Sequence, residues 1–338
     1  MYDILIVGAG ITAAALAASL KHKYKICIID VRKHIGGNCY DYKANGAYIH
    51  QYGPHFFHTD NKEVIEFVSK YTQWTPYQHS VCAEIKLNGE YKTVPFPYSK
   101  QTSSIIGNLT EEQIIDTFFK GYSKKMWGVD WDQLPNTIKG RVPKDTKDTS
   151  VYFPGQFSAI PTHGYSNMIE NMIDGCDLIL GASEDEWQAI PATHIVYCGR
   201  IDRIKLNNGL RIGSITGKWL DFRDLEIKIE VEKWKTPASV LNYCHNDIKC
   251  TRKTSYGYIY GSNCEIITKE TPIDGPPCSI TPFYPVPTSE NYEKHKILKD
   301  IVIHNFPNII LAGRIATHKY MDMDQCFGQA LSISKNFI

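Results

Sequence analysis

The chain has 338 residues, a formal net charge of +1, 43% hydrophobic residues and 22% charged residues. This length exceeds what one compact core usually holds and predicts two or three domains. The near-neutral charge, without a run of Lys or Arg, excludes the charge pattern of a nucleic-acid-binding protein. Local arginines must therefore bind any anionic ligand.

The ten cysteines are scattered along the chain and form no C-x-x-C pair. Cys244, His245 and Cys250 cluster loosely, but their spacing fits no zinc ligand set. We therefore expect no metal site, and we predict free thiols in a reducing cytoplasm.

The apolar run from Ile4 to Leu20 needs to be distinguished from a targeting segment. It lacks the basic residues that open a signal peptide, and Lys21 and Lys23 end it too early for a comfortable bilayer span. We interpret the run as a buried strand and a helix of a cytoplasmic protein without a membrane segment.

The first 30 residues show the order strand, turn, helix, strand. Residues 2–7 and 25–30 are rich in Ile and Val, as buried parallel strands are, and residues 11–22 are rich in Ala and Leu. This order within about 30 residues is typical of a βαβ unit.

The turn of this unit carries the pattern Gly8-x-Gly10-x-x-Ala13. Gly8 permits a tight turn, Gly10 lets a pyrophosphate approach the backbone, and Ala13 keeps helix and strand close. Asp30 ends the second strand, where its carboxylate can bind a ribose hydroxyl. The pattern predicts a dinucleotide site, and a purely structural glycine turn is the alternative.

A second glycine pair favours FAD over NAD as the dinucleotide. Residues 32–38 read R-K-H-I-G-G-N and follow Asp30 after one residue. Such a pair with flanking cations is a feature of large FAD proteins, in which it approaches the cofactor. A simple Gly-Gly turn is the alternative.

The remaining elements can be predicted from local patterns. Residues 84–94 predict a hairpin with Asn88-Gly89 as its turn, and residues 110–113 read as a capping box that opens a helix to about Lys125. Buried strands are predicted at 177–181, 194–197 and 308–312, a half-solvated strand at 220–231, and a last helix from about 324.

This order predicts an α/β fold built on a discontinuous Rossmann-like FAD-binding domain with a parallel sheet. We assign residues 1–75, 156–212 and 298–338 to that domain. A small helical domain is predicted at 98–140, and an inserted antiparallel-sheet substrate domain at 76–97, 141–155 and 213–297.

Several motifs follow one another along nearly the whole chain. They read R-x-H-I-G-G-N at 32–38, Y-G-P-H-F-F-H-T at 52–59, K-G-Y-S-x-x-x-W-G at 120–128, K-x-R-V-P at 139–143, G-Y at 164–165, F-Y-P-V at 283–286 and G-R-x-A-x-x-K-Y-x-D-M at 313–323. As an ordered set they resemble the UDP-galactopyranose mutase family, although each motif alone would be a weak signal.

The resemblance implies an isomerase, an intramolecular transferase, with an unusual use of flavin. It would interconvert UDP-galactopyranose and UDP-galactofuranose without net redox change, with N5 of reduced FAD acting as nucleophile at the anomeric carbon. An external reductant such as NAD(P)H would reduce the flavin. The product would feed a glycosyltransferase that builds a cell-surface glycan.

The resemblance also implies roles for individual residues. Guanidinium groups hold phosphate oxygens bidentately, and aromatic faces stack on bases. Surface or core roles remain the alternatives at each position. Catalytic roles are implied for Arg141, Arg314, His55 and Asp322. FAD contacts are implied for Gly8, Gly10, Ala13, Asp30, Arg32, Gly36, Gly37, Asn38, His55, Gly199, Gly313, Arg314 and Met323. Substrate contacts are implied for Phe118, Tyr122, Trp127, Arg141, Tyr152, Arg252, Tyr284, Arg314 and Tyr320.

Four departures from the family pattern lie on the substrate side. The segment from Pro97 to Phe118 is short, which leaves the oligomeric state open because the helical domain often supplies the dimer contact. Residues 149–151, 254–257 and 317–318 also differ from the usual family residues. They predict either UDP-galactopyranose bound by altered contacts or a related nucleotide-sugar.

Two other functions remain open at this stage. A flavin oxidoreductase of the amine-oxidase type shares the first-strand pattern, but its apolar substrate tunnel leaves Arg141, Arg252 and Arg314 unexplained. A flavoprotein that has lost its activity is the other alternative.

Overall fold

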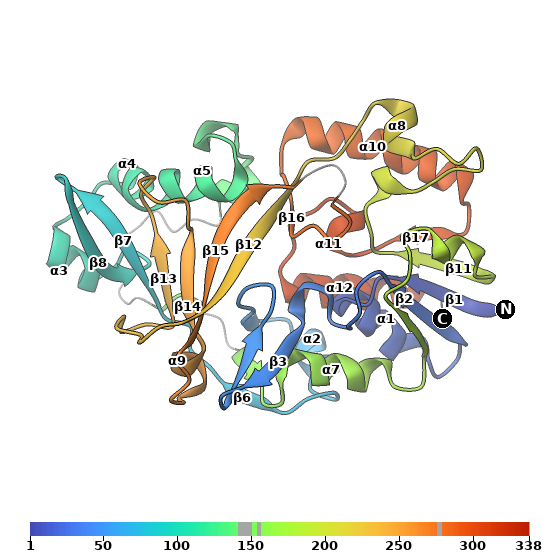
Figure 1. The fold of residues 1–338 in the computed structure, drawn as a ribbon, viewed down its shortest axis with the longest axis horizontal. Helices are drawn as coiled ribbons and strands as arrows, with labels where there is room; N and C mark the ends of the chain where they lie inside the picture. The colour runs from blue at the N-terminus through green and yellow to red at the C-terminus, as the bar shows by residue number, and fades with distance from the viewer. Residues whose placement is uncertain (141–150, 154–156, 276–278, 338) are drawn as a thin grey trace.

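The structure is a computed structural model that describes residues 1–140, 151–153, 157–275 and 279–337. Two sheets organise the chain (Figure 1). A parallel sheet contains the N-terminal strands, and a larger sheet lies beside it. The chain passes between the two sheets several times, so each is built from segments that are distant in sequence.

The smaller of these two sheets has five parallel strands in the order β10-β2-β1-β11-β17. Helix α1 (Ile11–Leu20) connects β1 to β2. The predicted βαβ unit and the Rossmann-like fold class are therefore confirmed. The strands are β1 (Tyr2–Val7), β2 (Ile26–Asp30), β10 (Asp177–Leu180), β11 (Ala192–Tyr197) and β17 (Ile309–Leu311).

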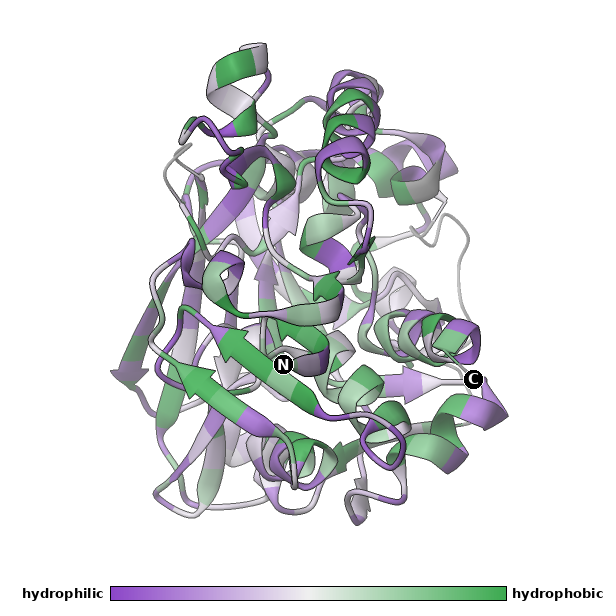
Figure 2. Cartoon of the chain, turned by 90° about the vertical axis from the view of Figure 1, so that its right-hand side faces the viewer, coloured by the Kyte–Doolittle hydropathy of each residue, from purple (hydrophilic) through white to green (hydrophobic). Residues whose placement is uncertain are grey.

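Helices cover both faces of the parallel sheet. Successive side chains of a strand point to opposite faces, so apolar strand residues are buried under helices on each side. Ile4 and Ile6 pack in one core with α1, α7 (Gly164–Ile173) and α12 (Met323–Ser334). Leu5 packs in the second core with Leu298 of α10 (Ser289–Asn305). The strands beside the N-terminus are accordingly hydrophobic along most of their length (Figure 2).

The larger sheet has seven strands in the order β16-β12-β15-β14-β13-β7-β8. Its pairs are antiparallel, as predicted, except that β13 and β7 run parallel. The strands are β7 (Val81–Leu87), β8 (Glu90–Phe96), β12 (Phe222–Val231), β13 (Val240–Tyr243), β14 (Arg252–Ser255), β15 (Ile266–Asp274) and β16 (Tyr284–Pro285).

The hairpin predicted around residue 88 is β7–β8. Leu87 pairs with Glu90, which leaves Asn88 and Gly89 as the two turn residues. Their φ angles of 52° and 87° are the left-handed values that the favoured two-residue hairpin turns require.

The predicted helix after Thr110 is present but is not uniform. The Thr110 side chain accepts from the Gln113 N–H, and Gln113 Oε1 accepts from the Thr110 N–H, so the capping box is formed. The helix then runs as α4, a π-helical segment η2, and α5. Their bounds are α4 (Glu111–Ile114), η2 (Ile115–Lys120) and α5 (Gly121–Trp127), with α3 (Lys100–Ile106) and α6 (Asn136–Lys139) nearby in sequence.

Shorter elements complete the described part of the chain. Two small sheets pair β3 with β4, and β9 with β5 and β6. The bounds are β3 (Asp41–Ala44), β4 (Ala47–His50), β5 (Phe57–Thr59), α2 (Lys62–Val68), β6 (Trp74–Pro76), β9 (Phe157–Pro161), α8 (Ile212–Thr216), α9 (Tyr256–Tyr260) and α11 (Gly313–Ala316).

One predicted strand differs from the structure in its burial. Strand β10 covers the predicted range 177–181 but is not buried, and Leu178 is 41% exposed. Strand β10 pairs only with β2 and therefore forms an edge of the sheet. Its short apolar run resembled a central strand because hydrophobicity alone does not reveal the number of neighbours.

None of the helices in the described ranges is long and apolar enough to cross a bilayer. No group of three or more His, Cys, Asp or Glu side chains in these ranges is placed to hold a metal ion. The nine cysteines that the structure describes are free thiols.

Candidate functional site

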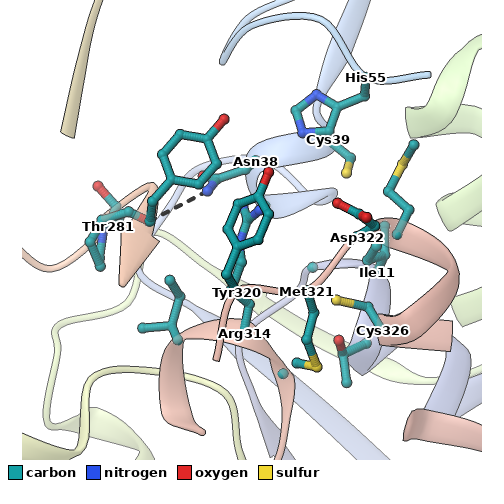
Figure 3. A pocket seen from close by; sticks show the side chains of 18 of the residues that line it. Ile11, Asn38, Cys39, His55, Thr281, Arg314, Tyr320, Met321, Asp322 and Cys326 are labelled. Carbon is teal, nitrogen blue, oxygen red and sulfur yellow. Dashed lines mark hydrogen bonds between the residues drawn. The ribbon is translucent and has the colours of Figure 1, made fainter. Parts of the chain in front are cut away.

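A cavity of about 770 Å³ lies where the carboxyl ends of the parallel strands meet the larger sheet. All the predicted site residues in the described ranges line it, whereas Arg141 lies outside those ranges. Figure 3 shows Asn38, His55, Arg314, Tyr320 and Asp322 turned toward this space. The structure thus brings together residues from segments far apart in sequence, while their individual roles stay predictions.

The two glycine patterns contact each other at one end of the cavity. The Gly36 N–H donates to the Ala9 carbonyl at 2.8 Å, and Gly10 and Gly36 form a parallel bridge. A Cβ on Gly37 would lie 3.0 Å from the Gly10 Cα, at a φ of +56°. The second glycine pair therefore packs on the first loop, which a simple surface turn would not do.

Asp30 braces the same loop from the end of β2. One carboxylate oxygen accepts from the Ala9 N–H at 2.6 Å, and the other accepts from the Arg32 N–H at 2.8 Å. Each oxygen can accept a further bond. The Asp30 carboxylate can therefore accept a hydrogen bond from a ribose hydroxyl, as predicted, in addition to holding the loop.

Arg32 and Asn38 link this loop to the segment before β16. Arg32 Nη2 donates to Asn38 Oδ1 at 2.7 Å, and its guanidinium lies 4.2 Å from the centre of the Tyr52 ring. Asn38 Nδ2 donates to the Pro282 carbonyl at 3.4 Å. Residues 280–282 thereby form part of the cavity wall next to the glycine loops.

His55 is held in one tautomer by its own turn. Its Nδ1 lies 2.8 Å from the Gly53 carbonyl, which can only accept, so Nδ1 carries the proton. Burial, with the nearby His50 and Arg314, lowers the pKa of His55 to about 3. The ring is therefore neutral at pH 7 and presents Nε2 as a hydrogen-bond acceptor.

Aromatic side chains form another part of the cavity wall. The Trp127 and Tyr320 ring centres lie 5.4 Å apart, and those of Tyr284 and Tyr320 lie 5.9 Å apart. Burial raises the pKa values of Tyr122, Tyr152 and Tyr284, so these phenols stay protonated and can donate hydrogen bonds. Such a wall can stack on a base or sugar ring and also donate to phosphate oxygens.

Phe118 lines the cavity but is mainly a core residue. Its side chain is 1% exposed and stacks on Phe96, with ring centres 5.6 Å apart. The core alternative considered for this position therefore has structural support, and any substrate contact can involve only a small part of the ring.

The two described arginines of the site have different surroundings. Arg252 Nε donates to Glu270 Oε1 at 2.7 Å, and Glu270 is 1% exposed. The Arg314 guanidinium lies 5.0 Å from the centre of the Tyr284 ring and pairs with no carboxylate of the described residues. Within the described ranges Arg314 thus has no ion-pair partner and offers its positive charge to the cavity, whereas Glu270 offsets much of the Arg252 charge.

Asp322 stands directly before α12. Its N–H donates to Gln325 Oε1 at 3.0 Å, so the residue takes part in the N-terminal cap of that helix. Gly199 and Gly313 line the cavity just after β11 and β17, and Met323 lines it at the start of α12, while their contacts with FAD stay predictions.

The sequence interpretation missed Glu270, His79 and Asn242, and all three are nearly buried. Asn242 and His79 line the cavity, and the Asn242 Oδ1 has no hydrogen-bond partner. A signal existed for Glu270, because it shares a face of β15 with the buried Thr268. A carboxylate on a buried strand face requires a cation or several hydrogen-bond donors, but the strand pattern does not identify Arg252 as the partner.

These features fit a dinucleotide at one end of the cavity. The Gly8 backbone has a φ of +114°, and a Cβ there would lie 3.0 Å from the Cys198 Cβ, so this turn requires glycine. The N-terminus of α1 follows this loop directly, and such helix ends favour phosphate.

Family models match two parts of the chain. One described as UDP-galactopyranose mutase matches residues 117–320. Another described as a Rossmann-like NAD(P)-binding domain matches residues 6–71. The second match covers both glycine patterns and confirms the type of domain predicted for this region.

Curated relatives match the full length of the chain. A dTDP-fucopyranose mutase from Escherichia coli is 29% identical over 385 residues and covers 100% of this chain and 99% of the relative. A UDP-galactopyranose mutase from Mycoplasma pneumoniae is 30% identical over 395 residues and covers 100% and 96%.

A solved structure supports the fold. The crystal structure of a reduced UDP-galactopyranose mutase matches with a TM-score of 0.70 and 14% identity, and covers 100% of this chain and 94% of that chain. With the family model and the full-length relatives, these matches show that the chain belongs to the UDP-galactopyranose mutase family, a family of isomerases.

Proposed function

We propose that the protein binds FAD and, with the flavin reduced, interconverts UDP-galactopyranose and UDP-galactofuranose without net redox change. The observation that carries this proposal is one cavity that is lined both by two glycine loops and by arginine and aromatic side chains. That combination suits a dinucleotide beside a second, anionic ligand with an aromatic base.

The residues that would hold FAD are those around the glycine loops. Gly8 permits the tight turn, Gly10 and Gly37 let the two loops pack against each other, and Asp30 and Arg32 fix these loops by hydrogen bonds. When bound and reduced, the flavin supplies a nucleophilic nitrogen, N5, for the anomeric carbon.

The remaining side chains would act on the nucleotide-sugar. Arg314, with Arg141 as its predicted partner, would bind the diphosphate and stabilise the negative charge on it as the anomeric bond breaks. The Tyr284 phenol can donate to the same oxygens because it stays protonated. The neutral His55 can accept a hydrogen bond through Nε2 without adding charge.

A related nucleotide-sugar is the second candidate substrate. The dTDP-fucopyranose mutase of E. coli aligns with this chain over its full length at nearly the same identity as the UDP-galactopyranose mutases. The substrate-side departures at 149–151, 254–257 and 317–318 also favour testing this substrate class.

A flavin oxidoreductase is less well supported. An apolar substrate tunnel does not explain Arg314, which has no ion-pair partner among the described residues, or the half-buried phenols that line the same cavity. Cytoplasmic location, an NAD(P)H-type reductant and a link to surface-glycan synthesis are predictions that rest on the family resemblance, and the oligomeric state stays open.

The proposal is tested by incubating the dithionite-reduced protein with UDP-galactofuranose and, separately, with the furanose form of dTDP-fucose. We expect conversion of at least one to its pyranose, and no conversion by the oxidised protein. Inertness toward both, and toward a wider set of nucleotide-sugars, would contradict the proposal. The relative kcat/KM of the two substrates decides between the candidates.

A further inference from the structure

The side chain of Lys125 ends inside a ring of backbone carbonyl oxygens. Its Nζ lies 2.7 Å from the oxygen of Tyr243, 2.8 Å from His245, 2.9 Å from Cys250 and 3.3 Å from Ile248. An ammonium group has three N–H donors and no acceptor, so this ring satisfies all of them. A side chain this well coordinated holds its surroundings in one arrangement.

The ring connects two walls of the candidate site. Its carbonyls belong to residues 243–250, which join β13 to β14, and these strands carry Asn242 and Arg252 to the cavity. Lys125 itself belongs to α5, which carries Tyr122 and Trp127 to the same cavity. One ammonium group therefore ties the aromatic helix to the strands that present the arginine.

Two further contacts fix α5 against the same neighbours. A Cβ on Gly121 would overlap the Cys244 carbonyl oxygen, so only glycine allows this close approach. Arg223 of β12 donates from Nη2 to the Lys125 carbonyl at 2.8 Å and from Nε to the Met126 carbonyl at 3.1 Å. The Arg223 guanidinium thus lies at the C-terminal end of α5, where positive charge stabilises a helix.

The neighbouring lysine has no such role. Lys124 pairs with Asp130 at 2.8 Å, and the two side chains are 58% and 67% exposed. Exposed pairs of this kind contribute little to stability. Lys124 therefore provides a control on the same turn of the same helix.

We propose that Lys125 is a positioning residue for the nucleotide-sugar. Its ammonium group holds α5 against the β13–β14 connection, so that Tyr122 and Trp127 face the ligand together with Arg252. This inference rests on the proposed function, because the ligand concerned is the nucleotide-sugar. Removal of the ammonium group leaves four carbonyls without their donor and frees the helix to shift.

The first test compares Lys125→Met, which keeps most of the apolar stem, with Lys124→Met. The connection is also held by His245, whose Nε2 lies 3.0 Å from Glu84 Oε1, so we expect the variant to fold. For Lys125→Met, the Kd for UDP and the KM should rise about tenfold or more, with a smaller change in kcat and unchanged FAD per chain. Lys124→Met should match the wild type.

The second test uses Lys125→Ala, which vacates the carbonyl ring. Added ethylammonium or potassium ions should restore UDP affinity in this variant. They should leave the UDP affinity of the wild type and of Lys124→Met unchanged. A small cation cannot reverse a general loss of structure, so restored affinity would show that the ring needs a bound cation. Failure of both cations to restore UDP affinity would contradict this role of the ring.

The outcomes separate this inference from the proposed function. If Lys125→Met binds UDP as tightly as a wild type that is active, the role of Lys125 is contradicted but the proposed function is not. A wild type that neither binds UDP nor converts a nucleotide-sugar contradicts the proposed function and the role of Lys125 together.

Discussion

Arg252 and Arg314 face the same cavity with different electrostatic environments. The buried Glu270 accepts from Arg252 at 2.7 Å, so this pair adds shape and hydrogen-bond donors more than net charge. Arg314 meets the Tyr284 ring face and no described carboxylate. We therefore assign to Arg314 the larger share of the charge that would hold a diphosphate.

Substitution of Arg314 tests this assignment. Arg314→Lys keeps the charge but loses the planar fork that binds phosphate oxygens in pairs, so kcat/KM should fall about 10- to 100-fold. FAD content should be unchanged. Lys299→Ala, which removes a cation from the exposed part of α10, should leave kcat/KM at the wild-type value. A wild-type kcat/KM in Arg314→Lys would contradict the need for a guanidinium group, because a single positive charge would then suffice to bind the diphosphate.

His50 lies completely buried beside His55. Its Nδ1 accepts from the His55 N–H at 2.9 Å, so the neutral ring carries its proton on Nε2, which lies 3.3 Å from the Tyr260 hydroxyl. Burial lowers the pKa of His50 to about 3. Protonation of the His50 Nδ1 would direct its N–H against the His55 backbone N–H, and this repulsion also lowers the pKa of His50.

This shift predicts a loss of stability in acid. Between pH 6.5 and the folded pKa of about 3, the unfolded chain binds a proton at His50 that the native protein does not. The free energy of unfolding should fall by about 2 kcal/mol from this residue between pH 6.5 and pH 5. Stability should be fully regained above pH 6.5.

Urea unfolding at several pH values measures this contribution. His50→Asn keeps an acceptor near the Nδ1 position but cannot titrate, so its stability should fall less steeply in acid than that of the wild type. His55 and His79, whose pKa values burial also lowers to about 3, are present in both proteins and cancel in the comparison. Parallel pH curves would contradict the assignment to His50.

At the scale of elements, the two glycine loops form one unit. Gly37 has a φ of +56°, and a Cβ there would lie 3.0 Å from the Gly10 Cα. Gly37→Ala therefore combines backbone strain of about 1–2 kcal/mol with an overlap against the first loop. We expect FAD affinity to fall at least tenfold and the purified protein to lose its yellow colour.

A second glycine-to-alanine change controls for general effects. Gly328 lies in α12, and a Cβ there would meet no atom within 4 Å. Gly328→Ala should keep the FAD content of the wild type, since Ala favours a helix. Equal FAD affinity in Gly37→Ala and the wild type would show that the loops can separate without consequence for the cofactor.

Elements with a local chemical signal could be predicted from the sequence. Asn88-Gly89 indicated the β7–β8 turn, and Thr110 with Gln113 indicated a helix start. The π-helical segment after α4 has no such signal, because an extra residue per turn is fixed by packing against neighbours. The edge position of β10 likewise depends on which strand lies beside it.

At the scale of the whole molecule, the cavity depends on contacts across long stretches of chain. The glycine pattern predicted its dinucleotide end because Gly8, Gly10 and Asp30 lie in one local unit. The pairing of Arg252 with Glu270 and the ring around Lys125 could not be predicted, since their partners come from strands and loops distant in sequence. Only the order of motifs indicated that these segments meet.

The fold itself does not decide between isomerase and redox chemistry. Dinucleotide-binding domains of this type serve both, and activity depends on the side chains grafted onto them. Membership of the mutase family favours the isomerase, as does Arg314, which faces the cavity without an ion-pair partner in the part of the chain that the structure describes. We therefore predict that the enzyme, once its flavin is reduced, converts many substrate molecules without further reductant.

An anaerobic stoichiometry measurement tests this claim most directly. The protein is first reduced with dithionite, and the remaining reductant is removed. UDP-galactofuranose or the furanose form of dTDP-fucose is then added, and flavin absorbance and product are measured over time. We predict many product molecules per flavin while the flavin stays bleached. One product or fewer per flavin, formed as the oxidised flavin spectrum returns, would contradict it.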